Sequence, residues 1–131
     1  MSQENVELVR RFTDAINRRD FDAAYENTAE DLETDLTRAV GIDQGMYNAA
    51  QTRRLLEEFA SSWEASEYVV DEWIEVGEYV VTPFTNRLRG RGGVEVEARA
   101  VVVWTIREGQ IARVCLFQGR EEALEAAGLR E

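Results

Sequence analysis

The segment Ala100–Trp104 reads AVVVW and contains no polar side chain. A β-strand with one face in water alternates apolar and polar residues, so an unbroken apolar run indicates a strand that is covered on both faces. Glu108 and Gly109 follow as a typical two-residue hairpin turn, and a second apolar run begins after Gln110. The chain must therefore fold so that something covers each face of this hairpin.

Pairing across the two-residue turn predicts which side chains share a face, because directly opposed residues lie on the same side of a sheet. One face is apolar along most of its length, and we expect it to meet helices. It holds Ala100, Val102, Trp104, Ile106, Ile111, Arg113, Cys115 and Phe117. The opposite face holds Val101, Val103, Thr105, Ala112, Val114 and Leu116.

The second face also needs a cover, because soluble proteins rarely expose apolar patches of this size. We predict that a second copy of the chain supplies it. The predicted homodimer packs through Val101, Val103, Val114 and Leu116. The alternative is that the C-terminal helix of the same chain lies over this patch.

Helical patterns precede strand patterns along the chain, which is typical of an α+β fold. At 131 residues the chain is predicted to form a single domain, 1–131. Apolar residues recur at helical spacing over 5–19, 21–27, about 49–64 and 120–127. Segments with a period of two cover 32–36, 68–76, 79–89, 94–107 and 110–118.

The composition restricts the chemistry that the chain can perform. It has no histidine, all 15 basic residues are arginine, and Cys115 is the single cysteine. A histidine base, a Schiff-base lysine, an intrachain disulfide and a cysteine zinc site are therefore excluded. No motif indicates a metal or a cofactor, so acid–base chemistry would depend on carboxylates, tyrosines or the thiol.

The net charge of −11 argues against nucleic acid and anionic membranes as partners. No apolar run approaches the length of a membrane span, and the first residues lack the apolar core of a signal peptide. We therefore expect a cytoplasmic protein.

Three stretches carry a family resemblance: SQENVELVRRFTDAINRRDFDAAY, VVVWTIREGQIARV and REEALEAAGL. The chain resembles, over nearly its whole length, the SnoaL-like proteins of the nuclear-transport-factor-2-like superfamily, which includes polyketide cyclases, ketosteroid isomerases and limonene epoxide hydrolases. The resemblance implies a curved antiparallel sheet wrapped around N-terminal helices as a cone with an internal apolar cavity, the cystatin-like α+β barrel. It also implies dimers formed through the sheet.

The same resemblance implies where catalytic groups would lie. The oxyanion tyrosine of ketosteroid isomerases falls on Phe12, their base on Leu36, and their oxyanion acid at or beside Val102. None of these side chains can donate a hydrogen bond or titrate. Asp35 neighbours the base position, but a shift of one residue turns a strand side chain to the opposite face.

The sequence therefore favours a protein that binds a small apolar or aromatic molecule in a largely hydrophobic pocket. The candidate ligand-binding residues are Phe12, Tyr25, Thr34, Phe59, Trp63, Val102, Trp104, Arg113 and Cys115. The alternative is a cyclase, isomerase or hydrolase in which Asp35, with its pKa raised by burial, acts as the acid–base group together with Tyr25 or Tyr47. A structural protein with a filled cone is the third possibility.

Overall fold

The computed structural model describes residues 2–128, and its elements follow the order that the sequence predicts, with helices first and most strands later. The elements are α1 (Ser2–Asn17), α2 (Phe21–Ala24), a 3-10 helix (Tyr25–Asn27), β1 (Thr28–Asp35), β2 (Met46–Tyr47), α3 (Ala49–Ser61), β3 (Ala65–Val70), β4 (Ile74–Val76), β5 (Tyr79–Arg89), β6 (Glu95–Arg107), β7 (Gln110–Phe117) and α4 (Arg120–Ala126). The fold is α+β, as expected. Among residues 2–128, no helix is long and apolar enough to cross a bilayer.

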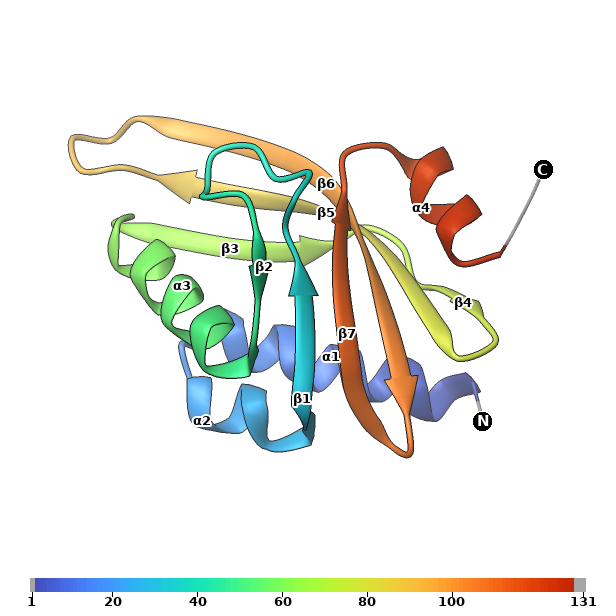
Figure 1. Cartoon of the computed structure of the whole chain (residues 1–131). Helices are drawn as coiled ribbons and strands as arrows, with labels where there is room; N and C mark the ends of the chain where they lie inside the picture. Colours follow the sequence, from blue (N-terminus) through green and yellow to red (C-terminus); the bar gives the residue numbers. More distant parts are fainter. Residues whose placement is uncertain (1, 129–131) are drawn as a thin grey trace.

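The strands form one seven-stranded sheet in the order β2-β1-β7-β6-β5-β3, with β4 also pairing with β5. Neighbouring strands run antiparallel except β1 and β7, which are parallel, so the sheet is mixed. It is curved and unclosed, with α1, α2 and α3 on one side and α4 on the other (Figure 1). We call these the inner and the outer face.

Local signals place the helix starts. The Asp20 carboxylate accepts a hydrogen bond from the backbone N–H of Ala23 and begins α2. At α3 the side chains of Asn48 and Gln51 each accept from the other's backbone N–H, which is the predicted capping box. These caps fix the positions at which the helices cross the inner face.

The single strand expected over 68–76 is wrong, because the chain breaks into β3 and β4 opposite Pro83. The Pro83 carbonyl accepts from the backbone N–H of Asp71 at 2.8 Å, so Pro83 directs its main-chain groups toward this neighbour. Proline has no N–H to return the bond, and a sheet ladder loses a rung at such a position. β3 therefore pairs with one half of β5 and β4 with the other.

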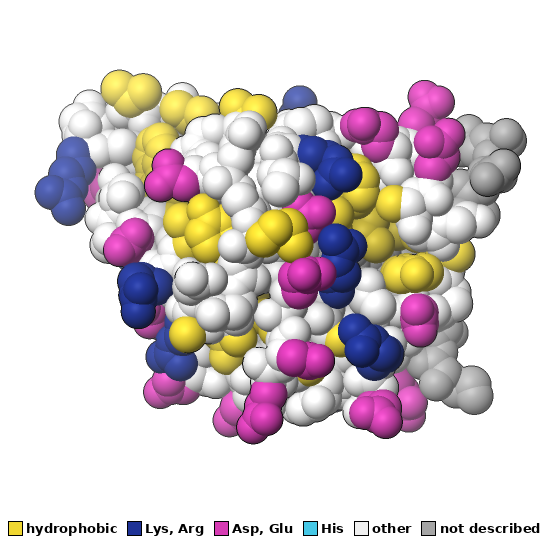
Figure 2. Space-filling view, in the orientation of Figure 1, with side chains coloured by type: hydrophobic (Ala, Val, Ile, Leu, Met, Phe, Trp, Pro, Cys, Tyr) yellow, Lys and Arg dark blue, Asp and Glu magenta, His cyan; other side chains and the backbone are white. Residues whose placement is uncertain are grey.

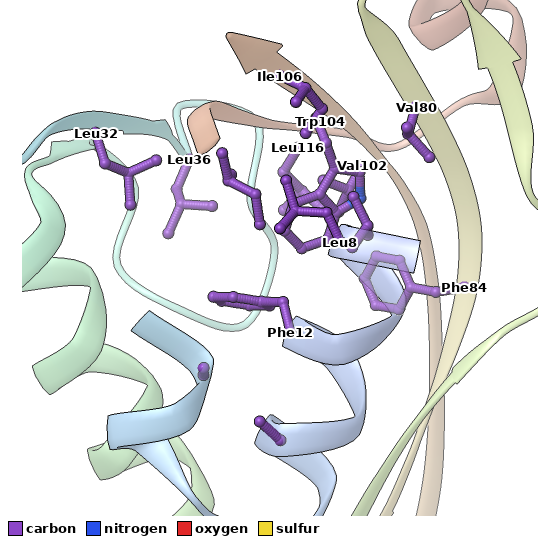
Figure 3. Close-up of a cluster of buried hydrophobic side chains, with 14 of the residues drawn as sticks. Leu8, Phe12, Leu32, Leu36, Val80, Phe84, Val102, Trp104, Ile106 and Leu116 are labelled. Atoms are coloured by element: carbon purple, nitrogen blue, oxygen red, sulfur yellow. The ribbon is translucent and has the colours of Figure 1, made fainter. Parts of the chain in front are cut away.

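The inner face meets the helices, and the even-numbered side chains of β6 point toward them (Figure 3). This confirms the predicted inward orientation of Val102, Trp104 and Ile106. The buried cluster here contains Leu8, Val9, Phe12, Ala15, Ala24, Leu32, Leu36, Ala39, Val80, Phe84, Val102, Trp104, Ile106, Ile111 and Leu116.

The outer face is covered in part by α4. A second buried cluster joins Val81, Val101, Val103, Cys115 and Phe117 of the sheet to Ala123, Leu124 and Ala127 at the C-terminal end. Val101 and Val103 are therefore covered by α4 of the same chain. This is the alternative that the sequence left open to a dimer contact at these positions. The predicted dimer surface through Val101, Val103, Val114 and Leu116 is wrong, because the last two side chains pack on the inner face.

A β-bulge at Ala112 explains the misplaced side chains of β7. The turn is as predicted, with positive φ at Glu108 and Gly109 and with Arg107 opposite Gln110. The register then slips, since Ile106 pairs with Ile111 but Thr105 pairs with Arg113, which leaves Ala112 unpaired. Beyond the bulge, every side chain of β7 points to the face opposite to the one expected.

Candidate functional site

The structure divides the predicted site residues between the two faces of the sheet. On the helix side lie Phe12, Tyr25, Thr34, Phe59, Trp63, Val102 and Trp104. On the outer side lie Asp35, Arg113 and Cys115. The sequence therefore predicts the inner position of the apolar and aromatic candidates correctly. It places Arg113 and Cys115 on the wrong face of the sheet.

The middle of the inner face is filled by packed side chains. The Phe12 ring centroid lies 5.3 Å from those of Tyr25 and Trp104, edge to face in both cases. Trp104 Nε1 donates to Thr82 Oγ1 at 2.9 Å in the buried interior. Phe12, Leu36 and Val102, the positions implied to carry catalytic groups, share this one cluster (Figure 3).

Tyr25 carries a hydroxyl that the fold leaves unpaired. Its Oη is buried and has no hydrogen-bond partner within residues 2–128. Burial raises the pKa of this phenol, although the charge of Arg53 opposes the shift. The group is a neutral phenol with free donor and acceptor capacity.

The other predicted hydroxyls on this side are already used. The Thr52 hydroxyl donates to Thr34 Oγ1 at 2.9 Å, which ties α3 to β1. The Tyr47 hydroxyl donates to the Asp43 carbonyl at 2.7 Å and holds the loop before β2. Among the predicted polar groups of the inner side, Tyr25 is the one whose hydroxyl makes no hydrogen bond within the described chain.

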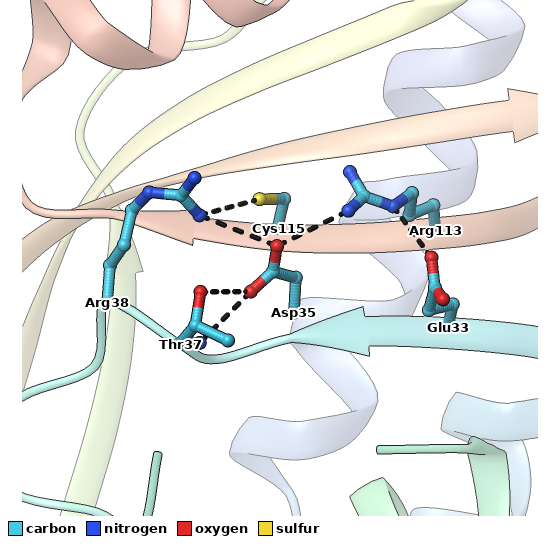
Figure 4. A network of polar contacts seen from close by, with 6 residues as sticks. All are labelled: Glu33, Asp35, Thr37, Arg38, Arg113 and Cys115. Atoms are coloured by element: carbon cyan, nitrogen blue, oxygen red, sulfur yellow. Dashed lines mark hydrogen bonds and ion pairs between the residues drawn. The ribbon is translucent and has the colours of Figure 1, made fainter. Parts of the chain in front are cut away.

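A polar cluster on the outer face surrounds Asp35 (Figure 4). Asp35 is 8% exposed. One oxygen of its carboxylate accepts hydrogen bonds from the backbone N–H of Thr37 at 3.0 Å and from the Thr37 hydroxyl at 2.7 Å. Arg38 Nη1 lies 3.5 Å and Arg113 Nη2 3.3 Å from the other carboxylate oxygen. In Figure 2 arginines and acidic side chains accordingly lie next to one another in the middle of this face.

These contacts set the ionisation of the cluster. Burial works to raise the pKa of Asp35, but the hydrogen bonds from Thr37 and the charge of Arg38 hold that pKa below its ordinary value. For the Cys115 thiol, burial and the neighbouring Asp35 carboxylate raise the pKa. Asp35 is therefore ionised and Cys115 a neutral thiol at neutral pH.

The prediction that Arg113 and Cys115 lie on the inner face is wrong, and the alternative that needs Asp35 in the cavity is not met. Asp35 alternates with Thr34 and Leu36, whose side chains point inward, so its own points outward. Arg113 and Cys115 are turned outward by the bulge. The expected acid–base pair of Asp35 with Tyr25 is consequently split across the sheet.

Sequence reasoning missed other members of the outer cluster. Arg38 and Thr37 come from the loop after β1, where no periodic pattern predicts orientation. Glu33 accepts from Arg113 Nε at 3.0 Å, and its alternation with Leu32 and Thr34 is the one signal that could have placed it outside. No group of three or more carboxylates or thiols within residues 2–128 is arranged to hold a metal ion.

A depression of about 310 Å³ lies where β3 begins, β5 ends and β6 begins. Arg87 stands in its wall between Glu67, at 3.8 Å, and Glu97, at 3.7 Å. The lining consists of Ala65, Ser66, Glu67, Arg87, Leu88, Arg89, Glu95, Val96 and Glu97. It lies outside the packed cluster, at a position that the sequence did not indicate.

Solved structures with the same fold include proteins from several sources. TerC, crystallised with polyporic acid, aligns with a TM-score of 0.74 at 19% identity, covering 95% of this chain and 98% of its own. A protein of Jannaschia sp. CCS1 assigned as a SnoaL-like polyketide cyclase aligns with a TM-score of 0.76 at 17% identity, covering 99% and 95%. An uncharacterised cystatin-fold protein of Novosphingobium aromaticivorans gives 0.73 at 20% identity, covering 89% and 98%.

At these identities the likeness establishes the fold alone. None of the curated proteins compared with the chain matches its sequence. Residues 9–114, most of the chain, match the family described as the SnoaL-like domain. The resemblance seen in the sequence is therefore confirmed, and the chain belongs to the SnoaL-like domain family.

Proposed function

We propose that the protein binds a small apolar or aromatic molecule at the open end of its inner face, between α3 and the far halves of β5 and β6. The observation on which this proposal rests is that the inner face of β6 is apolar along its length but is covered by helices at one end only. Val102 and Trp104 are 6% and 3% exposed, whereas Val96 and Val94 on the same face are 41% and 66% exposed. Exposed apolar surface of this kind is typical of ligand and partner sites.

Aromatic side chains from α3 supply the opposite wall. The ring centroids of Phe59 and Trp63 are 6.3 Å apart, and both side chains are half-buried. Trp63 reaches the turn between β5 and β6, since a Cβ on Gly90 would lie 3.7 Å from its ring. Flat aromatic walls with few polar groups suit an apolar or aromatic ligand.

The depression of about 310 Å³ is not this site, because Arg87, Glu67 and Glu97 in its wall alternate with the inward side chains of their strands and so lie on the outer face. Tyr25 packs on Phe12 in the buried cluster, so its unpaired hydroxyl would gain a hydrogen bond from a ligand oxygen or nitrogen that reaches this cluster. An unpaired buried hydroxyl costs about 1–3 kcal/mol. TerC, a structural relative, was crystallised with a small molecule, polyporic acid.

This proposal assigns no reaction to the protein. Asp35, the candidate acid or base, is held in ion pairs on the outer face, and the positions of the family's catalytic groups carry Phe12, Leu36 and Val102. A binding function needs none of them. A cytoplasmic location and a homodimer are parts of the same proposal, with the dimer contact moved away from the surface that α4 covers.

The test is a thermal-shift screen with steroid, polyketide and terpenoid fragments, since a ligand that binds only the folded state raises the melting temperature. We expect at least one class to raise it. Val96→Asp places a charge in the proposed site and should abolish the shift. Val40→Asp makes the same change at a valine of the loop after β1 that is 78% exposed, and it should bind as the unmodified protein does.

Tyr25→Phe refines the test. The variant should lose affinity for oxygen-bearing fragments and keep its affinity for hydrocarbon analogues, because it lacks only the hydroxyl. A screen without any shift, or a Val96→Asp variant that binds normally, would count against the proposal.

A further inference from the structure

Asn86 is a polar residue within a largely apolar strand face. On the inner face of β5 it stands between Phe84 and Leu88, which are 8% and 6% exposed. Asparagine is disfavoured inside β-strands, where β-branched and aromatic side chains fit better. The formation of β5 therefore does not explain why an amide occupies this position.

The pairing of the strands places this amide in the floor of the site proposed above. Asn86 lies opposite Tyr68 of β3 and Ala98 of β6, whose side chains share its face. Asn86 is half-buried and Ala98 is exposed. The Tyr68 ring stacks on Phe84, with the ring centroids 4.4 Å apart. A flat ligand lying on Val96 and Ala98 would therefore also cover Asn86.

The hydroxyl groups of β3 and β5 on this face already have partners. The Ser66 hydroxyl accepts from Arg19 Nη2 at 3.4 Å, and the Tyr68 hydroxyl is hydrogen-bonded to Thr82. The Asn86 side chain makes no hydrogen bond to any other part of the described chain. Its N–H donors and its carbonyl acceptor are both open to a ligand.

The same face carries no charge that would match an ionised ligand. Every Arg, Asp and Glu of β3, β5 and β6 falls on an outer position of the register, so the inner side chains of these strands are uncharged. Arg113 of β7 also points outward. The net charge of −11 further opposes an anionic ligand.

We propose that Asn86 sets the ligand specificity of this site, and that the ligand is an apolar or aromatic molecule with one neutral group that donates and accepts side by side, as a carboxamide or a lactam does. Such a group pairs with an asparagine amide through two hydrogen bonds. A ligand without it would cover the amide and leave it unpaired, which is how a polar site rejects an apolar analogue. This inference rests on the proposed function, because it needs a ligand at the open end.

Three probes of similar shape test the inference: benzamide, toluene and benzoate. NMR titration of the isotope-labelled protein follows two reporters, the side-chain amide signals of Asn86 and the indole N–H signal of Trp63 in the opposite wall. Benzamide should shift both reporters, and toluene should shift the Trp63 signal. Benzoate should bind more weakly than benzamide, because no cation on this face compensates its charge.

Variants of Asn86 separate its role from that of the apolar floor. Asn86→Leu keeps the approximate volume and removes the amide, so the ratio of benzamide to toluene affinity should fall about tenfold. Asn86→Asp should instead favour benzamidine, the cationic analogue of benzamide, because a carboxylate and an amidinium form two charge-assisted hydrogen bonds.

Asn27→Leu, at a half-buried asparagine of the 3-10 helix, is the matched control and should bind the probes as the unmodified protein does. Circular dichroism will show that each variant is folded. Asn86 makes no side-chain hydrogen bond within the described chain, so its replacement removes none that the fold uses.

The inference and the proposed function fail in different ways. If toluene shifts the Trp63 signal but Asn86→Leu leaves the ratio of affinities unchanged, the role of Asn86 is overturned and the ligand site stands. A preference for benzoate over benzamide would overturn the assignment of a neutral ligand. If no probe shifts the Trp63 signal, the ligand site itself is contradicted, and this inference falls with it.

Discussion

Asp35 shows how burial and pairing turn a carboxylate from a candidate base into a structural anion. It is buried with Thr37, Arg38 and Arg113 around it, and each contact favours the charged form. A general base needs a pKa near the working pH, whereas these contacts lower the pKa of Asp35. The residue is suited to holding the loop after β1 against β7.

This role predicts a pH-dependent contribution to stability. A carboxylate whose pKa is lower in the folded than in the unfolded chain stabilises the fold above its unfolded pKa of about 3.9, and the effect is lost as the pH falls through the folded value. Asp35→Asn should therefore lower the free energy of unfolding by about 1–2 kcal/mol at pH 7. The difference should shrink below about pH 4.

Urea unfolding of both proteins between pH 7 and pH 3 measures this effect. Asp31→Asn, at an exposed carboxylate of the same strand, is the control and should change little at either pH. A deficit for Asp35→Asn that stays constant down to pH 3 would show that packing, and not charge, is responsible.

At the scale of elements, the bulge at Ala112 decides which side chains of β7 meet the helices. It turns Val114 and Leu116 inward and Arg113 and Cys115 outward. A strand with one residue fewer would place a guanidinium and a thiol against the apolar cluster instead. One unpaired residue thus separates the apolar inner wall from the outer polar cluster.

Deletion of Ala112 should therefore be strongly destabilising, by about 3 kcal/mol or more, because it forces a charge into the core or a register shift of the strand. Ala112→Gly retains the extra residue and should cost no more than about 1 kcal/mol. Chemical denaturation of both variants measures the difference. A deletion variant that unfolds at the same urea concentration as the parent would mean that the bulge is dispensable.

The sequence predicts the elements well where periodicity is strong. The two apolar faces of β6, the hairpin turn and the capping box at α3 all appear as expected, because alternation and turn chemistry are local properties. The bulge is different, since no residue type marks Ala112 as unpaired. The break between β3 and β4 arises from Pro83 on the neighbouring strand, so its cause lies outside the segment that it interrupts.

The site was less predictable than the fold, for related reasons. The positions of Phe12 and Val102 follow from helical and strand periods, and both lie on the inner face. The outer cluster joins the end of β1 to residues of β7 that are about 80 positions away in the chain, and a parallel pairing of that kind leaves no local trace in a sequence. Arg38 belongs to a loop, where orientation depends on tertiary contacts.

For the whole molecule, α4 takes the place that a second subunit was predicted to occupy. Removal of residues 119–131 should expose Val101, Val103, Cys115 and Phe117. We expect the truncated chain to lose about 2–4 kcal/mol of stability and to bind a hydrophobic dye. The Cys115 thiol, buried in the intact chain, should react with a thiol reagent at least tenfold faster.

Glu125→Ala, at an exposed position of α4, is the control for this truncation and should leave the thiol protected. An intact protein whose thiol reacts as fast as that of the truncated chain would show that α4 does not seal the outer face in solution.

The parallel contact between β1 and β7 has a consequence for how the chain is made. β1 emerges from the ribosome early, and until β7 follows it has only the two residues of β2 beside it. The apolar side of α1 likewise packs against Trp104 and Leu116, which are synthesised near the end of the chain. Long-range pairings of this type slow folding, so the nascent protein must carry uncovered apolar helices through most of its synthesis and complete its core only at the last strand.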